Sequence, residues 1–373
     1  MLKKIAIIIS PNYKDYAKKY LAECADSIRE QDYGGEMKIF ITDNESSEES
    51  YEYLMNILLA AINPPNPPLP GGQFEIVRNQ NNDGFAKGNN DAMMLALEQG
   101  FDYVILFNMD TAVEKSCVRL MVEAANPPNP PLQGGQIGAV QARLMLYGKK
   151  NIINSLGNVT HFLGFGYAEG YGERYKSPLP PLLKGAEIAY PSGAAVLFKR
   201  EALEKAGLFD EEFWMYNEDQ DLGWRLWLAG YQCVLAPGAV VYHKYEFSRS
   251  IKKYYFMDRN RMIAMLKNYR WATLILIFPA FIIMEIGLIF FSVKGGWFRE
   301  KMRVYKYFAS LKNWRYLSAA RRQAQELRRV KDREIIKLFS GKIWYQEVGS
   351  GRLKLANAIF NFYWRIIKVF ILW

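Results

Sequence analysis

Three carboxylates within four residues, Glu218, Asp219 and Asp221, are the densest candidate for catalytic chemistry in the sequence. Aromatic side chains, Trp214 and Tyr216 among them, stand just before them. A carboxylate beside apolar surface loses hydration when it ionises, so its pKa rises toward the range that suits a general base. The alternative is structural, because acids at a helix start interact favourably with the helix dipole and with unpaired backbone N–H groups.

Strands and helices are predicted to alternate ahead of this cluster. Apolar runs of strand length end in polar residues, and helical patterns separate them. The alternation predicts a doubly wound α/β domain, in which ligands collect at the carboxyl ends of the strands. The predicted strands cover residues 5–10, 37–42, 74–78 and 103–107. The polar residues at their carboxyl ends are Asn12, Tyr13, Asp43, Asn82 to Asn90, and Asp110.

Four motifs follow one another in a fixed order at these positions. They are Thr42-Asp43-Asn44-Glu45-Ser46-Ser47, Asn82-Asp83-Gly84-Phe85-Ala86-Lys87-Gly88-Asn89-Asn90, Asn108-Met109-Asp110 and Asn217-Glu218-Asp219. Each alone is a common turn or helix cap. Together they resemble glycosyltransferase family 2, the inverting transferases of the GT-A fold, and in particular the rhamnosyltransferase-like members. The resemblance covers about residues 4–245 and implies a Rossmann-like nucleotide-diphospho-sugar transferase domain.

The resemblance implies a role for each acid of the cluster. Asp219 matches the catalytic base, which takes the proton of the acceptor hydroxyl during a single inverting displacement. Glu218 and Asp221 are expected to orient the base or the acceptor, Glu218 as a catalytic residue and Asp221 as a substrate-binding one.

The donor site is implied in the same way. Asp43 matches the family's acceptor for the nucleotide base, because a carboxylate can accept the imide N–H of uracil or thymine. The segment from Asn82 to Asn90 matches the part whose glycines let the backbone approach the donor and whose helix start faces its phosphates. The residues expected to bind the nucleotide are Asn12, Tyr13, Asp43, Asn82, Gly84, Lys87 and Asn89.

A divalent cation, Mg²⁺ or Mn²⁺, is expected beside the diphosphate. Asp110 keeps the second carboxylate of the family's Asp-x-Asp metal motif, and oxygen ligands suit such ions. Position 108 is Asn, which departs from the strict Asp-x-Asp motif. The resemblance implies that this departure is usual in the rhamnosyltransferase-like group. His243 matches a position that completes the metal site in some members; a lone histidine after a strand is otherwise a structural residue.

The charge distribution separates the chain into two parts. Residues 1–250 carry 23 basic and 31 acidic side chains, a net charge of −8, whereas residues 251–373 carry 25 basic and 7 acidic ones, a net charge of +18. We therefore predict a catalytic domain over 1–250 and a basic, apolar, helical membrane-associated region over 251–373. An anionic membrane surface is the expected partner of the tail; nucleic acid is not expected, because no nucleic-acid recognition motif accompanies the charge.

The apolar run from Trp271 to Val293 is long enough to cross a bilayer core. Pro279 and Glu285 lie inside it, and a carboxylate at bilayer depth is costly. Three interpretations stay open: a spanning helix, an interfacial helical hairpin broken at Pro279, and a buried helix of a soluble protein. The basic stretches 299–337 and 353–373 are predicted to lie on the membrane as amphipathic segments.

Other features set the cellular context. Three cysteines without metal-ligand spacing favour a reducing compartment. The first apolar run is too short for a signal peptide, so the catalytic part is expected at the cytoplasmic face of the membrane. Proline-rich stretches at 63–73, 126–136 and 177–187 are predicted to be inserted surface loops. The glycine- and aromatic-rich stretch 151–174 is predicted to be a flexible segment with aromatic faces that suit sugar rings or a lipid-linked acceptor; an irregular packed loop is the alternative.

The sequence thus predicts an inverting, metal-dependent glycosyltransferase at the membrane. The donor would be a nucleotide sugar, dTDP-rhamnose or a UDP-sugar, and the acceptor a saccharide or lipid-linked saccharide in cell-surface polysaccharide synthesis. A noncatalytic sugar-nucleotide or membrane-binding scaffold of the same fold is the alternative. A nucleotidyltransferase fits less well, because its Gly-rich loop is expected after the first strand, where this chain has Ser10-Pro11-Asn12-Tyr13.

Overall fold

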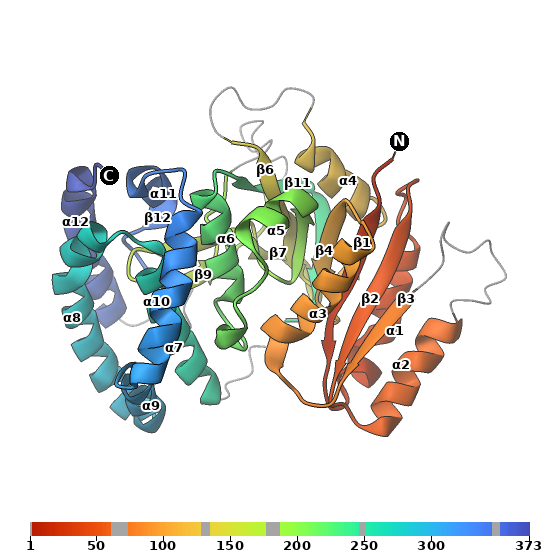
Figure 1. Ribbon diagram of the computed structural model, residues 1–373, viewed down its shortest axis with the longest axis horizontal. Helices are drawn as coiled ribbons and strands as arrows, with labels where there is room; N and C mark the ends of the chain where they lie inside the picture. The colour runs from red at the N-terminus through yellow and green to blue at the C-terminus, as the bar shows by residue number, and fades with distance from the viewer. Residues whose placement is uncertain (1, 61–73, 128–134, 177–186, 246–250, 345–350) are drawn as a thin grey trace.

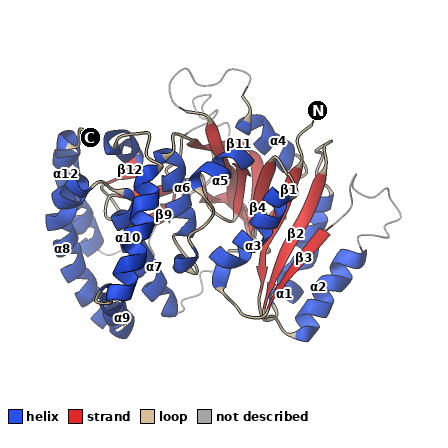
Figure 2. Ribbon diagram, in the orientation of Figure 1, coloured by secondary structure: helices blue, strands red, loops and turns tan. Residues whose placement is uncertain are grey.

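The computed structural model describes residues 2–60, 74–127, 135–176, 187–245, 251–344 and 351–373. Its core is a nine-stranded sheet with helices on both faces (Figures 1 and 2). The predicted proline-rich inserts fall almost wholly outside the described residues, as does the predicted domain boundary at residue 250.

The first half of the sheet is parallel, as the sequence predicts. Strand order is β3-β2-β1-β4, with β1 in the middle pairing in parallel with both β2 and β4. These strands are β1 (Ile5–Asn12), β2 (Met37–Asn44), β3 (Phe74–Asn79) and β4 (Tyr103–Phe107). Because all four run in one direction, their carboxyl ends meet at one edge, and the predicted donor residues follow there.

Alternate residues of each strand enter different cores. On β1, Ile5 and Ile7 pack with one cluster of buried side chains, whereas Ala6 and Ile8 pack with a second one on the other face. The first cluster is completed by α1 (Tyr16–Arg29), α2 (Glu48–Ala60) and α4 (Cys117–Ala125). The second is completed by α3 (Gly84–Glu98), α5 (Arg200–Ala206) and α6 (Glu218–Leu228). A strand buried on both faces reads as the continuous apolar run seen in the sequence.

The second half of the sheet is mixed. Strand β10 (Ala195–Lys199) pairs antiparallel with β4 and with β6 (Ile137–Leu146), and β11 (Gln232–His243) pairs in parallel with β6. Strand β5 (Thr111–Val113) joins the edge by pairing Thr111 with His243. This pairing brings the end of β11 against the Asp110 turn, since the Lys244 amide also donates to the Asp110 carbonyl at 2.8 Å.

The stretch 151–174 is ordered, which corrects the expectation of a flexible segment. It contains most of β7 (Lys149–Ser155), which pairs with β6, and the short strands β8 (Asn158–His161) and β9 (Gly166–Ala168). Strand β12 (Phe339–Ser340), from the C-terminal part, pairs with β8. The local sequence does not indicate this order, because the strands are short. The distant partner of β8, strand β12, also lies about 180 residues away in the sequence.

The C-terminal part is a helical layer at the left of Figure 1. It comprises α7 (Lys252–Asn268), α8 (Trp271–Lys294), α9 (Phe298–Phe308), α10 (Leu311–Glu326), the short α11 (Asp332–Ile335) and α12 (Gly351–Phe370). The predicted continuous basic region over 299–337 is therefore split, with a turn near Ser310. A third core cluster joins this layer to α6, through Trp224 and Leu228, and to the β8–β9 loop, through Phe162.

Candidate active site

A cavity of about 270 Å³ opens at the carboxyl edge of the parallel strands. Three of the predicted donor residues line it: Tyr13, Asn82 and Gly84. Its other walls are Ser10, Pro11, Tyr16, Asn44, Phe85, Asn108, Trp214 and Met215. The cavity thus gathers residues from the ends of β1, β2 and β4, the start of α3 and the loop before α6.

Gly84 allows the start of α3 to approach that loop. Its φ is +88°, and a Cβ atom there would stand 2.5 Å from the Trp214 carbonyl oxygen. Both conditions require glycine. The Ala86 amide then donates to the same carbonyl at 3.1 Å, while the Asn82 side chain accepts from the Gly84 amide at 3.1 Å. The motif therefore fixes Trp214 as the cavity wall opposite β1.

Asp43 presents one free carboxylate oxygen. Its Oδ1 accepts from Asn12 Nδ2 at 2.8 Å, whereas its buried Oδ2 has no hydrogen-bond partner within the described chain and lies 3.7 Å from Arg78 Nε. Asn12 is fully buried and also accepts from the Ala17 amide at 2.9 Å. Asn12 therefore positions Asp43 and α1, and its contact with the nucleotide stays a prediction.

Lys87 and Asn89 are engaged within α3. Lys87 Nζ lies 2.7 Å from Asp91 Oδ1, one helical turn on. Asn89 donates to the Phe85 carbonyl at 2.8 Å, and its Oδ1 is a buried acceptor for which the described residues supply no donor. Lys87 stays about one-third exposed, so its ammonium group can turn from Asp91 toward an anion in the site.

Asp110 and His243 come together although 133 positions separate them in the sequence. His243 Nε2 lies 3.3 Å from Asp110 Oδ1. On its other side, His243 Nδ1 is 2.9 Å from Asn154 Oδ1, which can only accept. If the ring proton is on Nδ1, as this contact requires, Nε2 carries a lone pair facing the carboxylate. Two acceptors that face each other at this distance form a place for a cation.

This pair fits a divalent metal that completes its shell with substrate. Asp110 Oδ1 is a buried acceptor unpaired with any described donor, and a carboxylate and an imidazole are both metal ligands. The described residues hold no cluster of three or more His, Cys, Asp or Glu side chains that could bind a metal by themselves. The remaining ligands would be diphosphate oxygens and water.

Asp219 lies in the first turn of α6, and none of the described Lys, Arg or His side chains forms an ion pair with it. Its Oδ2 accepts from the Gly193 amide at 3.3 Å and its Oδ1 from the Gln220 amide at 2.8 Å. Burial raises the pKa of Asp219 to about 6, against the opposing effect of these backbone hydrogen bonds. Gly193 lies between Asp219 and Phe85, since a Cβ atom added to it would stand 3.4 Å from the Phe85 ring and 3.9 Å from the Asp219 Cβ. Phe85 lines the cavity and Asp219 does not. Asp219 therefore lies next to this part of the cavity wall, with a pKa in the range of a general base.

Glu218 is more deeply enclosed than Asp219. Its Oε2 is buried and finds no hydrogen-bond donor in the described part of the chain. Burial, and then the neighbouring charge of Asp219, raise the pKa of Glu218 well above its ordinary value. Two adjacent acids whose ionised forms repel each other stay singly ionised over a wide pH range. Asp219 is therefore the acid that ionises first, and its charge keeps Glu218 protonated.

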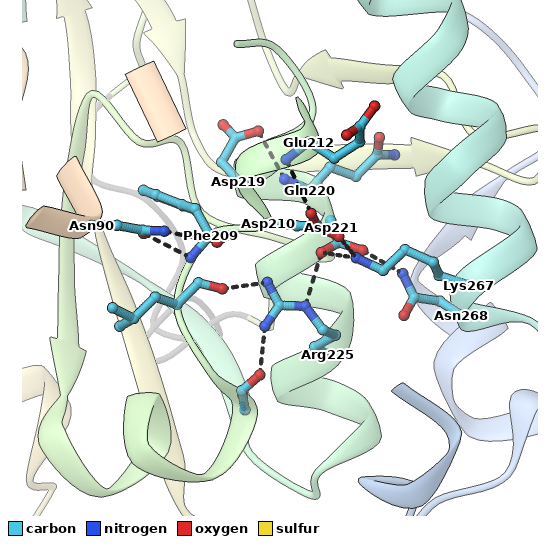
Figure 3. Close-up of polar contacts among 12 residues, drawn as sticks. Asn90, Phe209, Asp210, Glu212, Asp219, Gln220, Asp221, Arg225, Lys267 and Asn268 are labelled. Atoms are coloured by element: carbon cyan, nitrogen blue, oxygen red, sulfur yellow. Dashed lines mark hydrogen bonds and ion pairs between the residues drawn. The ribbon is translucent and has the colours of Figure 1, made fainter. Parts of the chain in front are cut away.

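Asp221 belongs to a different environment (Figure 3). It is fully buried and accepts from Arg225 Nε at 2.8 Å, Lys267 Nζ at 3.0 Å and Asn268 Nδ2 at 2.9 Å. The positive charges of Lys267 and Arg225, with the hydrogen bond from Asn268, outweigh the effect of burial and lower the pKa of Asp221 to about 2. The expectation that Asp221 binds substrate is not supported by this placement, because its oxygens are committed to α6 and α7.

The loop before Asp219 is held in an unusual backbone conformation by α7. Trp214, Tyr216 and Asn217 all have positive φ, between 59° and 68°, which costs free energy for non-glycine residues. Asn260 on α7 donates from Nδ2 to the carbonyls of Phe213 at 2.9 Å, Met215 at 3.0 Å and Tyr216 at 2.7 Å. One side chain of the C-terminal part thus fixes the segment that carries the cavity wall and leads to Asp219.

Sequence reasoning missed three residues of this site: Asn154, Trp214 as a cavity wall, and Asn260. Asn154 lies in the stretch expected to be flexible, and Asn260 in the tail expected to serve the membrane. The available signal was weak: Asp258-Arg259-Asn260-Arg261 is a polar run between the apolar and aromatic residues 254–257 and 262–266, and all four side chains are buried.

Known proteins resemble this chain in sequence and in fold. A segment of 56 residues is 45% identical to N-acetylglucosaminyl-diphospho-decaprenol L-rhamnosyltransferase of Mycobacterium tuberculosis, and this match spans 15% of the chain and 18% of that enzyme. Among solved structures, S. aureus TarS 1–349 in complex with UDP-GlcNAc superposes with a TM-score of 0.51 at 14% identity, covering 98% of this chain and 90% of that one.

A second structure, GalNAc-T7 with UDP, GalNAc and Mn²⁺, superposes with a TM-score of 0.52 at 14% identity. The match covers 72% of this chain and 48% of that chain. At such identities the superpositions establish the fold, a GT-A sheet extended by C-terminal helices. The family model described as glycosyl transferase family 2 matches residues 7–207, more than half of the chain. The chain therefore belongs to glycosyltransferase family 2.

Proposed function

We propose that this protein transfers a sugar from a nucleotide-diphospho-sugar to an acceptor hydroxyl with inversion, using Asp219 as the base. The observation that carries the proposal is the environment of Asp219: its carboxyl group accepts from two backbone amides next to the cavity wall at Phe85, and burial raises its pKa to about 6. Asp219 and His243 both lie beyond the residues that the family model matches, so their roles rest on this geometry.

The reaction needs a single displacement. Asp219 takes the proton of the acceptor hydroxyl while the hydroxyl oxygen forms a bond to C1 of the sugar. The bond from C1 to the diphosphate oxygen breaks, and the nucleoside diphosphate leaves with its electron pair. Asp43 Oδ2 accepts the imide N–H of a pyrimidine base. Asp110 and His243 would hold a divalent ion, which would supply positive charge to the diphosphate. The donor is dTDP-rhamnose or a UDP-sugar.

The acceptor is a lipid-linked or polymeric saccharide at a membrane surface. Among the described helices, α8 alone is long and apolar enough to cross a membrane. One side of α8 packs on the protein, while its other side exposes large apolar side chains such as Ile275, Phe278 and Phe290, which are 57–72% exposed. Helix α12 lies against α8 and exposes Leu355, Phe362 and Val369 to a similar degree. We define these exposed side chains of α8 and α12 as the apolar face.

The carboxylate of Glu285, which lies within the apolar helix α8, is compensated by partners on the neighbouring helices. It is buried on the protein side of α8 and bonded to Arg261 of α7, to Lys301 of α9 at 2.6 Å and to Tyr305 at 2.9 Å. Arg261 and Lys301 also contact Asp258. A helix bonded at its middle to three charged or polar side chains of neighbouring helices fits a position lying in the membrane surface, with the apolar face toward the lipid.

Thermal unfolding with UDP, dTDP and GDP, each with and without Mn²⁺, tests the donor site. A ligand bound by the folded state alone raises the unfolding midpoint. We expect a Mn²⁺-dependent rise of the unfolding midpoint with a pyrimidine diphosphate. The rise should be lost in Asp43→Asn, because the new amide NH₂ group must face either the imide N–H of the base or the donating Nδ2 of Asn12. Asp26→Asn, the same change at a side chain 65% exposed on α1, is the matched control. An equal rise in Asp43→Asn and the parent would remove Asp43 from the site.

A further inference from the structure

A second, larger cavity lies in the C-terminal helical layer. It has a volume of about 790 Å³ and is formed between the start of α8, one side of α10 and the chain end after α12. Four arginines contribute to its wall, together with two tryptophans, a serine, a glutamine and an alanine; the described lining contains no acidic side chain. The lining residues are Arg270, Trp271, Ala272, Ser318, Arg321, Arg322, Gln325, Arg328 and Trp373.

Two of the arginines are fixed by the fold. Arg321 lies over the Trp271 ring, with its guanidinium carbon 4.1 Å from the ring centroid, and donates to the Tyr269 carbonyl at 2.7 Å. Arg328 pairs with Asp332 at 2.7 Å. Burial, and then the charge of Arg328, lower the pKa of Arg321, so positive charge is already in excess here. An anion in the cavity would relieve this repulsion.

The other two arginines are free to meet a ligand. Arg270 and Arg322 are exposed, and no carboxylate of the described residues lies within ion-pair distance of either side chain. A guanidinium presents paired N–H donors that match phosphate oxygens in two-bond geometry. Four guanidinium groups around one cavity, with a serine and a glutamine beside them, therefore select an anion with several oxygen acceptors.

The place of the cavity indicates where that anion comes from. Trp271 is the first residue of α8, and Trp373 follows α12, so one end of the apolar face lies here. Trp373 Nε1 donates to Thr273 Oγ1 of α8 at 2.9 Å, which joins the two helix ends. Trp271 is 58% exposed, and tryptophan prefers the level of the lipid headgroups. With the apolar face in the acyl region, the arginines reach headgroup depth.

We propose that this cavity is a binding site for the phosphate group of a membrane lipid. The arginines would hold the phosphate, the two tryptophans would lie at the interface, and the acyl or polyprenyl chain would continue along α8 and α12. The site is separate from the donor cavity and its occupancy does not depend on sugar transfer. A binding experiment can therefore support it even if the proposed reaction is wrong.

The test compares two charge-matched double variants of the full-length protein. Arg270→Gln/Arg322→Gln removes the two exposed arginines of the cavity. Lys312→Gln/Arg315→Gln removes two exposed basic residues of the same helix layer that do not line it. Sedimentation with phosphatidylcholine vesicles containing phosphatidylglycerol measures the partition coefficient. Since a basic side chain near an anionic surface contributes about 1 kcal/mol, we expect the first variant to bind roughly tenfold or more weakly and the control to lose less than about threefold. Equal unfolding midpoints verify the fold of both.

Three further vesicle and solution arms identify the anion. Vesicles brought to the same surface charge with oleate carry carboxylate in place of added phosphate, and the two variants should then bind alike; an equally large difference on oleate would overturn a phosphate site. Vesicles doped with a polyprenyl diphosphate should again bind Arg270→Gln/Arg322→Gln more weakly than the control variant. A difference larger than with phosphatidylglycerol would identify the polyprenyl diphosphate as the preferred source of phosphate. A smaller difference would identify bulk phospholipid. Inorganic pyrophosphate that stabilises the parent while both variants bind vesicles equally would show a soluble-anion site and contradict the lipid assignment.

Discussion

Asp219 and Asp221 lie two positions apart in the first turn of α6, yet their surroundings on the two sides of that helix shift their pKa values in opposite directions. Toward the sheet, Asp219 meets two backbone amides and no cation, and its pKa rises to about 6. Toward α7, Asp221 meets Arg225, Lys267 and Asn268, and its pKa falls to about 2. Figure 3 shows the two carboxylates in these separate environments.

The difference shows that the helix dipole does not decide the state of an acid in a first turn. Both carboxylates share that favourable field, so the opposite shifts come from burial and from the side chains that face each one. One side of α6 keeps a carboxylate that can accept a proton near neutral pH. The other side uses an acid of the same type to attach α6 to the C-terminal helices.

Asp219→Asn is expected to have the largest effect on turnover. The amide keeps the shape but cannot accept the acceptor's proton, so kcat should fall by roughly 10²- to 10⁴-fold. The unfolding midpoint should stay the same or rise, because a carboxylate with a raised pKa destabilises the folded state when it ionises. Radiometric transfer assays and thermal unfolding measure the two effects. Parent-level transfer by Asp219→Asn would assign the base elsewhere.

Asp221→Asn should show the reverse pattern. Removing one partner of a buried ion pair leaves cations without compensation, which typically lowers the free energy of unfolding by about 3–5 kcal/mol. Lys267 retains Asp210 as a second partner, which favours the lower end of that range. Urea denaturation measures the loss. If Asp221→Asn instead abolished turnover at unchanged stability, Asp221 would belong to the chemistry after all.

Asn154→Ala tests the proposed cation site through a residue that contacts the ligand His243 but would not itself bind the cation. The Asn154 carbonyl holds the His243 ring so that Nε2 faces Asp110, and loss of such a support typically weakens metal binding by roughly 10- to 100-fold. The readout is the Mn²⁺ concentration that gives half of the nucleotide-dependent thermal shift. Asn158→Ala, on the following strand, is the control variant. Unchanged Mn²⁺ dependence in Asn154→Ala would restrict His243 to a structural role.

The sequence predicted the parallel sheet because β1, β2 and β4 each contain a short apolar run and helical patterns separate these runs. It predicted the position of Asp219, Asp110 and Asp43 because each ends a strand or starts a helix, where side chains must face the sheet edge. It could not separate Asp219 from Asp221, since the difference comes from Lys267 and Asn268, more than 40 residues later. Asn154 and Asn260 were missed for the same reason: pairing between distant segments gives them their partners, and no local periodicity records it.

The pH dependence is the finest test of the contrast between the two acids. Asp219 must be ionised to act as a base, so kcat should rise with pH through an apparent pKa of about 6 and level off above it. Stability responds to Asp221 in another window: its folded pKa of about 2 lies below the ordinary value of about 3.9, so its contribution is present above about pH 4 and is lost as the pH falls toward 2. Acid unfolding and the activity profile should therefore separate by about two pH units, and in Asp221→Asn the low-pH loss of stability should shrink. An activity profile that followed the unfolding curve would mean that one carboxylate cluster, and not two, controls both properties.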